Sequence, residues 1–110
     1  MPLGIDHLQQ KIGEWSDVAF GVSTPEASRT YSILEHMKEE VEELQESPTD
    51  LTEYADVFTL LLDAARTQGI SGEDILFAAY GKLAENRHRQ WGPVNEKGYH
   101  NHIKADDLSK

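Results

Sequence analysis

Two short acidic motifs, KEEVEEL at residues 38–44 and EYADV at residues 53–57, carry carboxylates at helical spacing. At about 100° per residue, Glu40 and Glu43 lie on one flank of a helix beside its apolar stripe. Glu53 and Asp56 are one turn apart on a second segment. Converging carboxylates repel one another unless a divalent cation lies among them, and oxygen ligands favour Mg²⁺, with Mn²⁺ as the alternative. The spacing therefore indicates a metal site.

The acidic residues also have a simpler interpretation, because a charged helix face is usually just solvated. That interpretation fits three glutamates on the opposite side of the first helix, Glu35, Glu42 and Glu46. The second helix is apolar except for one narrow polar stripe, formed by Glu53, Asp56, Thr59 and Asp63. Burying unpaired carboxylates would cost several kcal/mol, so the stripe must face water, a basic partner or a cation. Periodicity alone does not decide among the three.

A basic group follows in KLAENRHRQW at residues 82–91. Lys82, Asn86 and Arg89 share one helical face at i, i+4 and i+7, whereas Arg87 lies about 140° from Lys82. Basic residues at this end of a helix also complement its dipole, which is the simpler interpretation. Beside an acidic metal site, a face of Lys, Asn and Arg more specifically indicates a clamp for polyphosphate.

The elements that must position these groups are four helices. Start and stop signals place them at Ile5 to about Phe20, Pro25 to Glu46, about residue 51 to Thr67, and from Ser71 to near QWGPV at residues 90–94. The turn SPTD at residues 47–50 makes the second and third helices antiparallel neighbours, so their carboxylates can meet. No strand pattern is present. We expect an all-α four-helix bundle with short turns as one domain, residues 1–93, and an extended polar tail, residues 94–110, with a frayed end.

Composition narrows the partners. The chain has 110 residues and a formal net charge of −10, which argues against a nucleic-acid polymer or an anionic membrane as partner. It has no Cys, and the N-terminus has no basic start followed by an apolar run, so we expect a cytoplasmic protein. A chain this short, with a long apolar third helix, is expected to bury surface in a homodimer or homotetramer.

The acidic and basic motifs together resemble those of the MazG-like all-α nucleoside triphosphate pyrophosphohydrolases. That superfamily carries Glu-Glu-x-x-Glu on one helix, as at Glu39, Glu40 and Glu43, and Glu-x-x-Asp on the next, as at Glu53 and Asp56. A Lys and an Asn-x-x-Arg segment follow, similar to the residues Lys82, Asn86, Arg87 and Arg89. The resemblance covers roughly residues 5–93.

This resemblance implies hydrolysis of a nucleoside triphosphate to the monophosphate and pyrophosphate, by water attack at the α phosphorus. It implies a cation held by Glu40, Glu43, Glu53 and Asp56, with Glu43 or Glu40 accepting the proton of the water. Glu39, which is turned further toward solvent, is a weaker candidate for a catalytic role. The basic group would hold the charge of the departing pyrophosphate.

The base would contact aromatic residues. Trp15 shares an apolar stripe with Ile5, Leu8 and Ile12, so core packing is favoured and base stacking comes second. Trp91 follows the basic motif, and we expect it near the ligand or at an interface. The sequence predicts neither the base nor the sugar of the substrate.

Other functions are weighed against this one. A di-iron bundle would need Glu-x-x-His on two helices, and the chain offers one promising case, Glu85 to His88. His100 and His102 alternate on an extended segment, but surface histidines in a polar tail are usually not ligands. A non-catalytic helical adaptor or antitoxin-like protein would explain the acidity and the amphipathic helices, but it leaves the polar stripe of the third helix without a role.

Overall fold

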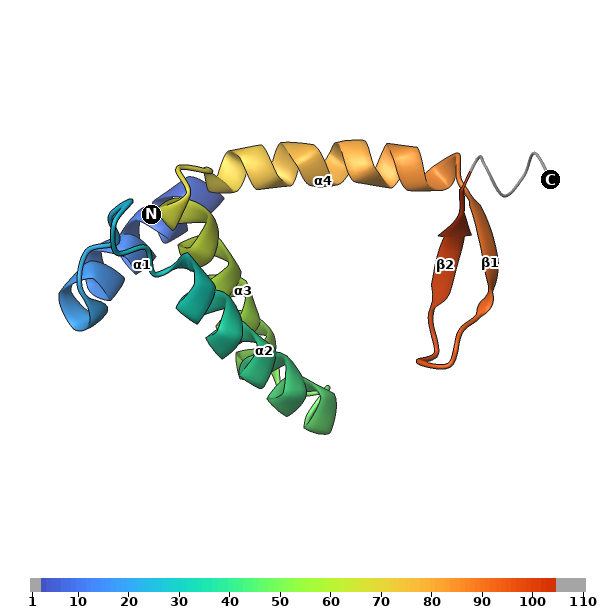
Figure 1. Ribbon diagram of the computed structural model, residues 1–110, viewed down its shortest axis with the longest axis horizontal. Coiled ribbons are helices and arrows are strands. Elements are labelled where there is room, and N and C mark those ends of the chain that lie inside the picture. The colour runs from blue at the N-terminus through green and yellow to red at the C-terminus, as the bar shows by residue number, and fades with distance from the viewer. Residues whose placement is uncertain (1–2, 105–110) are drawn as a thin grey trace. The chain divides into compact units, whose positions relative to one another are not determined.

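Four helices account for most of the chain in the computed structural model, which describes residues 3–104 (Figure 1). They are α1 (Ile5–Phe20), α2 (Thr30–Glu46), α3 (Leu51–Thr67) and α4 (Gly72–Arg87), followed by the strands β1 (Gln90–Val94) and β2 (His100–Ile103). The chain divides into two units, residues 1–76 and 77–110, and each is described by itself. The all-α class is confirmed, and the small sheet is a minor addition to it.

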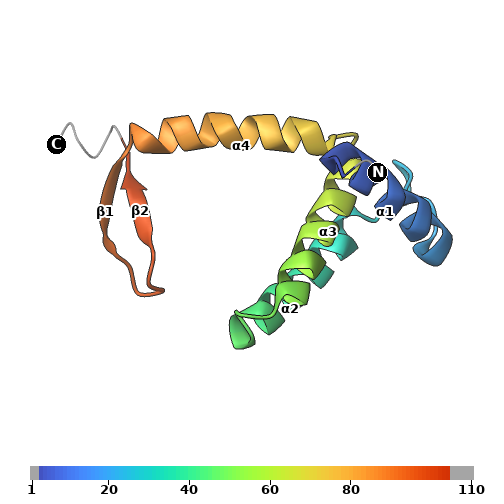
Figure 2. The same cartoon turned by 180° about the vertical axis from the view of Figure 1, so that it is seen from behind.

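The helices α2 and α3 form an antiparallel hairpin in the first unit, and they run side by side in both views (Figures 1 and 2). Ser47 N donates to Glu43 O at 3.0 Å and closes α2. Asp50 caps α3, because its Oδ1 accepts a hydrogen bond from Thr52 N at 3.0 Å. The predicted turn at residues 47–50 is therefore confirmed, and it brings the end of α2 next to the start of α3.

Buried polar contacts fix α1 against this hairpin. Gln9 is buried, and its Nε2 donates to Leu62 O and to Ile70 O, both at 3.0 Å. Its Oε1 accepts from Gly72 N at 3.0 Å. One amide therefore joins α1, the C-terminal part of α3 and the start of α4. Gly21, with φ of 93°, ends α1 at the predicted residue.

The predicted start of the second helix at Pro25 is wrong, since α2 begins at Thr30. Thr24 Oγ1 does accept a hydrogen bond from Ala27 N at 2.9 Å, as an N-cap would. Ser23 Oγ then accepts from Arg29 N at 3.0 Å. Such side-chain bonds satisfy the backbone without a helix, so residues 25–29 form bends and loop instead.

The start of α4 follows the predicted capping box. Ser71 Oγ accepts from Asp74 N at 3.0 Å, and Asp74 Oδ2 accepts from Ser71 N at 3.4 Å. The helix ends at Arg87, before the predicted end near residues 90–94. Those residues are strand β1 instead.

A β-hairpin in the second unit corrects the prediction that no strand is present. β1 and β2 pair antiparallel, with Gln90 opposite Ile103 and a register irregularity between Trp91 and Val94. The turn is closed by Asn95, whose Oδ1 accepts from Lys97 N and Tyr99 N at 3.0 and 3.1 Å. Gly98 follows with φ of 91°, a conformation that favours glycine. Residues 105–110, the last part of the predicted tail, lie outside the described residues.

Many large apolar side chains are exposed. On one face of α3, Leu51, Tyr54, Phe58 and Leu61 are 80%, 50%, 42% and 38% exposed. The buried apolar core of the described residues is small: Ile33, Leu62 and Ala64. Within residues 3–104, no helix is long and apolar enough to cross a membrane.

Candidate active site

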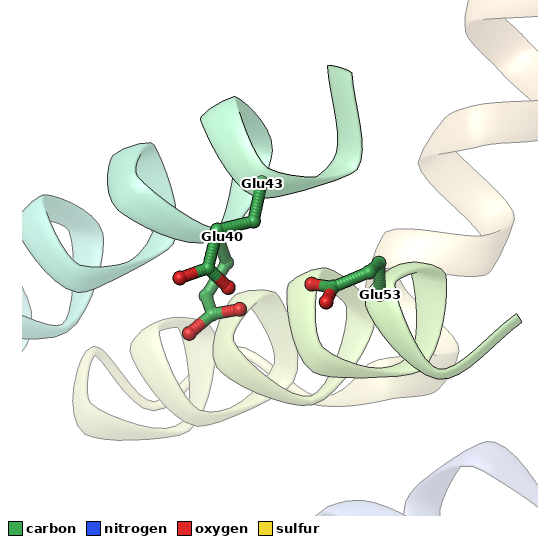
Figure 3. Close-up of side chains that lie close together, drawn as sticks. All are labelled: Glu40, Glu43 and Glu53. Atoms are coloured by element: carbon green, nitrogen blue, oxygen red, sulfur yellow. The ribbon is translucent and has the colours of Figure 1, made fainter. Parts of the chain in front are cut away.

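Three of the four predicted metal-ligating carboxylates converge where α2 and α3 lie side by side. Glu40 and Glu43 come from α2 and Glu53 comes from α3 (Figure 3). One carboxylate oxygen of each lies within 4.8 Å of one oxygen of each of the others. The tight turn between the helices produces this arrangement, because it places residues ten apart in sequence across from one another. The structure therefore brings together side chains that the helical phase alone had only put on compatible faces.

The electrostatics of this carboxylate cluster are unfavourable for three separate negative charges. Burial raises the pKa of Glu40 above its ordinary value, and the neighbouring Glu43 and the charge of Asp56 raise it further. Burial is also the main reason that the pKa of Glu53 is raised, followed by the charges of Glu43 and Glu40. Both shifts favour the protonated form, and at Glu40 the opposing effect of His36 on the pKa is the smallest of the causes.

The fourth predicted ligand, Asp56, is not among the three gathered carboxylates, although its charge raises the pKa of Glu40 and of Glu53. Asp56 is exposed on α3, one turn beyond Glu53. Glu39 is exposed on α2 and lies outside the cluster as well. The roles of Asp56 and Glu39 stay predictions.

Within residues 3–104, the cluster has carboxylate oxygens without hydrogen-bond partners, and such oxygens can bind a divalent cation. Glu40 Oε2 and Glu53 Oε2 are buried and have no hydrogen-bond partner within the described part of the chain. Buried polar atoms without partners are costly, and two such oxygens facing a third carboxylate suit a hard cation with oxygen ligands. Glu40 Oε1 does have a neighbour, since His36 Nε2 lies 3.3 Å from it. Sequence reasoning missed His36, although its spacing of four residues from Glu40 was a signal.

A pocket of about 480 Å³ opens beside the cluster in the first unit, and His36 lines it. Its apolar lining is Ile12, Trp15, Phe20, Ile33 and Leu60, and its polar lining is Arg29, Ser32, His36, Thr59 and Asp63. This volume lies within the range of about 300–1,000 Å³ typical of small-molecule sites. An aromatic and aliphatic wall with a few polar groups suits a flat, partly polar ring.

The favoured interpretation of Trp15 as a core residue is wrong. Its side chain is 64% exposed, packs edge-to-face on Phe20 at 5.2 Å between ring centroids, and lines the pocket. The apolar periodicity of α1 was misleading because the buried face of that helix is formed by Gln9, Gly13 and Ser16, and not by the apolar stripe. The second interpretation, contact with a base, stays a prediction.

Asp63 belongs to a buried network that the sequence analysis missed. Ser16 Oγ donates to its Oδ2 at 2.7 Å, and Arg66 Nε donates to its Oδ1 at 3.0 Å. Arg66 Nη2 also donates to Asp17 Oδ1 at 2.9 Å. Gly13 makes room for Arg66, because a Cβ there would lie 2.6 Å from Arg66 Cδ. The predicted polar stripe of α3 thus divides into a half-buried Glu53 and an exposed Asp56 at the start of the helix and a buried Asp63 with a donor on each oxygen.

The predicted phosphate clamp lies in the second unit, where its members are linked through Glu85. Lys82 Nζ lies 3.3 Å from Glu85 Oε2, and Arg89 Nη2 lies 2.6 Å from Glu85 Oε1. Arg89 Nη1 also donates to Asn86 Oδ1 at 2.8 Å. The side-chain contact with Lys82 is the main reason that the pKa of Glu85 is lowered, with the charge of Arg89 next. Glu85 is therefore used in an ion-pair network, which disfavours the di-iron interpretation.

The remaining predicted residues have separate surroundings. Arg87 is exposed, away from the Glu85 contacts. Trp91 Nε1 donates to Asn86 O at 3.1 Å, and its ring meets His102 edge-on at 6.0 Å between centroids. His100 Nδ1 bonds to Gly92 O across the hairpin. The histidine contacts join the two strands, and the Trp91 bond joins β1 to the end of α4. The predicted roles of Trp91 and Arg87 in ligand binding stay predictions.

The fold is that of a MazG-like protein. A MazG-like pyrophosphohydrolase of cyanophage S-2L, solved with dGDP and three catalytic Mn²⁺ ions per active site, superposes with a TM-score of 0.71 at 32% sequence identity. The match covers 94% of this chain and 100% of that chain. The expected resemblance is therefore confirmed.

Comparison of the sequence identifies a more specific family. Residues 8–109 match the profile of the dATP/dGTP pyrophosphohydrolases, and the chain belongs to this family. A dATP/dGTP diphosphohydrolase of Salmonella phage PMBT28 is 37% identical over 99 residues, 90% of this chain and 31% of that protein. The Eaa protein of Salmonella phage P22 is 36% identical over 104 residues, 94% of this chain and 31% of that protein. The chain thus spans about a third of the length of these curated relatives.

Proposed function

We propose that this chain hydrolyses nucleoside triphosphates to the monophosphate and pyrophosphate, dependent on a divalent cation, with dATP and dGTP as the first substrates to consider. The observation that carries the proposal is the convergence of Glu40, Glu43 and Glu53 with two unpaired buried oxygens. Support comes from the family, which is named for this reaction on these two nucleotides, and from the relative of phage PMBT28.

The carboxylates Glu40, Glu43 and Glu53, together with Asp56, hold the cation, with Mg²⁺ as the expected ion and Mn²⁺ as the alternative. When bound, this ion supplies Lewis acidity and positive charge beside the triphosphate. The Mn²⁺ ions in the cyanophage structure support a divalent cation without distinguishing the two metals.

The reaction needs a proton acceptor for the attacking water. The water oxygen bonds to the α phosphorus, the bond from that phosphorus to the α–β bridging oxygen breaks, and negative charge moves onto pyrophosphate. Glu43 or Glu40 accepts the water proton, and Glu39 is the weaker candidate for the same role. The raised pKa of Glu40 makes its carboxylate a better proton acceptor than an ordinary glutamate.

Phosphate binding falls to the basic face of α4. Lys82, Asn86 and Arg89 donate to the phosphate oxygens, and Arg87 contributes if the substrate reaches its side of the helix. For Lys82 and Arg89, a polyphosphate takes the place that Glu85 has as counter-charge in this structure.

The base enters the pocket that Trp15 lines, where a flat ring can stack on the exposed indole. Trp91 is the second candidate for contact with the base. Deoxyribose over ribose is the expected sugar preference, because the family is named for deoxynucleotides.

The active form is a homodimer or homotetramer in this proposal. The exposed apolar face of α3, with Leu51 80% exposed and Phe58 42% exposed, supports burial against another copy. Light scattering that finds a stable monomer at micromolar concentration would contradict it.

The product spectrum tests the function. The purified chain is incubated with each common nucleoside triphosphate, Mg²⁺ or Mn²⁺, and ¹⁸O-labelled water. The proposal predicts pyrophosphate and a labelled monophosphate, with dGTP and dATP among the best substrates. Diphosphate with orthophosphate would mean attack at the γ phosphorus, and no turnover would favour the non-catalytic adaptor.

A further inference from the structure

The pocket beside the carboxylate cluster contains two charged side chains, Asp63 and Arg29, and they differ in what they can still bind. Asp63 accepts from Ser16 on one oxygen and from Arg66 on the other. Each of its oxygens thus already has a protein donor, so Asp63 serves mainly to hold its neighbours. This leaves Arg29 as the charged group available to a ligand.

Arg29 is held in place through one end of its guanidinium. Its Nη2 donates to Ser16 Oγ at 3.0 Å and lies 3.4 Å from Asp17 Oδ1. Asp17 is itself fixed by Arg66, and the guanidinium lies over the Phe20 ring, with Cζ 5.9 Å from the centroid. The side chain is 15% exposed, so it is ordered by packing as well as by hydrogen bonds.

The rest of the guanidinium is not satisfied. Its Nε is buried and has no hydrogen-bond partner among the described residues. A buried donor without an acceptor is uncommon in folded proteins, so this guanidinium has hydrogen-bonding capacity that the described residues do not use. Arginine has donors only, so whatever approaches it must present acceptors.

We propose that Arg29 binds the edge of a purine that carries N7 and the substituent at position 6, and that it makes the pocket prefer guanine to adenine. Guanine presents two adjacent acceptors there, N7 and O6, whereas adenine presents N7 beside an amino donor. A donor-only side chain therefore matches guanine along the whole edge and opposes the adenine amino group. The preference rests on the proposed function, because it assumes that this pocket holds the base.

The size of the effect follows from paired contacts of arginine with guanine elsewhere, which give roughly tenfold to hundredfold discrimination. Ser16, Asp17 and Asp63 are positioning residues in this arrangement. They touch Arg29 or each other and contribute to specificity by holding its guanidinium.

Binding of monophosphates to the unmodified protein tests the proposal without any hydrolysis. Calorimetry with Mg²⁺ present compares dGMP, dAMP, dIMP and the 2-aminopurine deoxynucleotide. dIMP keeps O6 and N7 but lacks the 2-amino group, so we expect it to bind like dGMP. The 2-aminopurine nucleotide lacks O6 and should bind like dAMP, about tenfold more weakly. If the two analogues exchange places, the 2-amino group decides the preference and the proposal is wrong.

Variants then assign the preference to Arg29. Arg29→Gln should bring the ratio of dGMP to dAMP affinity close to one, because an amide can donate or accept. Arg66→Gln is the comparison variant: it loosens Asp17 and Asp63 without lining the pocket, so it should lower the melting temperature and change the ratio less than Arg29→Gln does. A folded Arg29→Gln protein that keeps the wild-type ratio would overturn the proposal. If Arg29→Gln does not fold, the analogue series decides.

Failure of the proposed function can be distinguished from failure of the inference about Arg29. In that case no triphosphate releases pyrophosphate, while the order of monophosphate affinities still reports on Arg29. If dGMP binds no better than dAMP although pyrophosphate is released from triphosphates, only the inference about Arg29 falls.

Discussion

Two charged regions of the molecule differ in whether their charges have partners. They are the acidic cluster of α2 and α3 and the basic face of α4. In the first, Glu40 and Glu53 each keep one buried oxygen without a partner among the described residues, and burial raises the pKa of both. In the second, Lys82 and Arg89 both contact Glu85, whose pKa is lowered. The first region has more negative charge than His36 beside Glu40 can compensate, whereas the second contains its own counter-charge.

This difference shows which assignment, the metal site or the phosphate clamp, the structure supports more strongly. Gathering carboxylates without a cation is unfavourable, so an arrangement of this kind is explained by an ion that binds there. An exposed set of ion pairs along a helix is common and contributes little by itself. The acidic site can thus be argued from the geometry of this chain, while the phosphate clamp depends more on the resemblance to MazG-like enzymes.

Removing one carboxylate of the acidic cluster should have the largest effect on activity. Glu53→Gln should lower metal-dependent hydrolysis more than about a hundredfold, because even groups that only orient metal ligands contribute about 10- to 100-fold. Steady-state release of pyrophosphate measures the loss. Glu42→Gln is the matched control, since Glu42 is an exposed glutamate on α2 outside the cluster. Equal activity of the two variants would contradict a metal role for Glu53.

Removing a basic group should have the next largest effect. Lys82→Ala or Arg89→Ala should lower kcat by on the order of a hundredfold, the usual cost of losing one donor to developing charge. Arg87→Ala, a change of an exposed arginine in the same segment, should have little effect. If KM rises while kcat is unchanged, these residues bind the ground state and the transition state equally, and the leaving-group role is wrong.

Neutralising Glu85 should leave the basic face of α4 without its counter-charge. In Glu85→Gln, Lys82 and Arg89 lose their negative partner, so pyrophosphate should bind severalfold more tightly in an inhibition assay. The effect should shrink at high salt because the groups are exposed. Weaker binding of pyrophosphate would show that Glu85 orients the basic side chains more than it competes with phosphate.

The smallest expected effect concerns the metal-free protein. The pKa of Glu40 and that of Glu53 are raised in the folded state, so at neutral pH their charges destabilise the fold. Lowering the pH from about 7 toward 5 protonates them in the folded state first, and their contribution to stability should rise. Thermal melts with a chelator should therefore show a melting temperature that increases in this range. Glu40→Gln should flatten the profile, and an unchanged profile would exclude this cause.

Local signals in the sequence predicted much of the fold. The apolar spacing and Gly21 gave the bounds of α1, and the Ser71–Asp74 capping box gave the start of α4. The same reasoning failed for α2, because Thr24 caps only a turn and nearby Ser side chains bind the backbone. The hairpin was missed although Asn95 and Gly98 are typical turn residues, because its strands are short and β1 contains a Gly-Pro pair, which is unusual in a strand.

The site was predictable where it depends on helical phase and not where it depends on packing. Glu40, Glu43 and Glu53 follow from phase and a tight turn. The exposure of Trp15 does not, because α1 buries the face with the small or polar residues Gly13 and Ser16 instead of its apolar stripe. Arg29 could not be found by periodicity either, since it precedes the first turn of α2 and is held by residues of α1.

Direct binding of Mn²⁺ tests the central claim, that the unpaired carboxylates of α2 and α3 form a cation site. Metal-free protein is titrated with Mn²⁺, and free and bound ion are separated by electron paramagnetic resonance, with no nucleotide present. The account predicts saturable binding to the wild type and to Glu42→Gln, competition by Mg²⁺, and loss of this binding in Glu53→Gln. Undiminished binding in Glu53→Gln would contradict it.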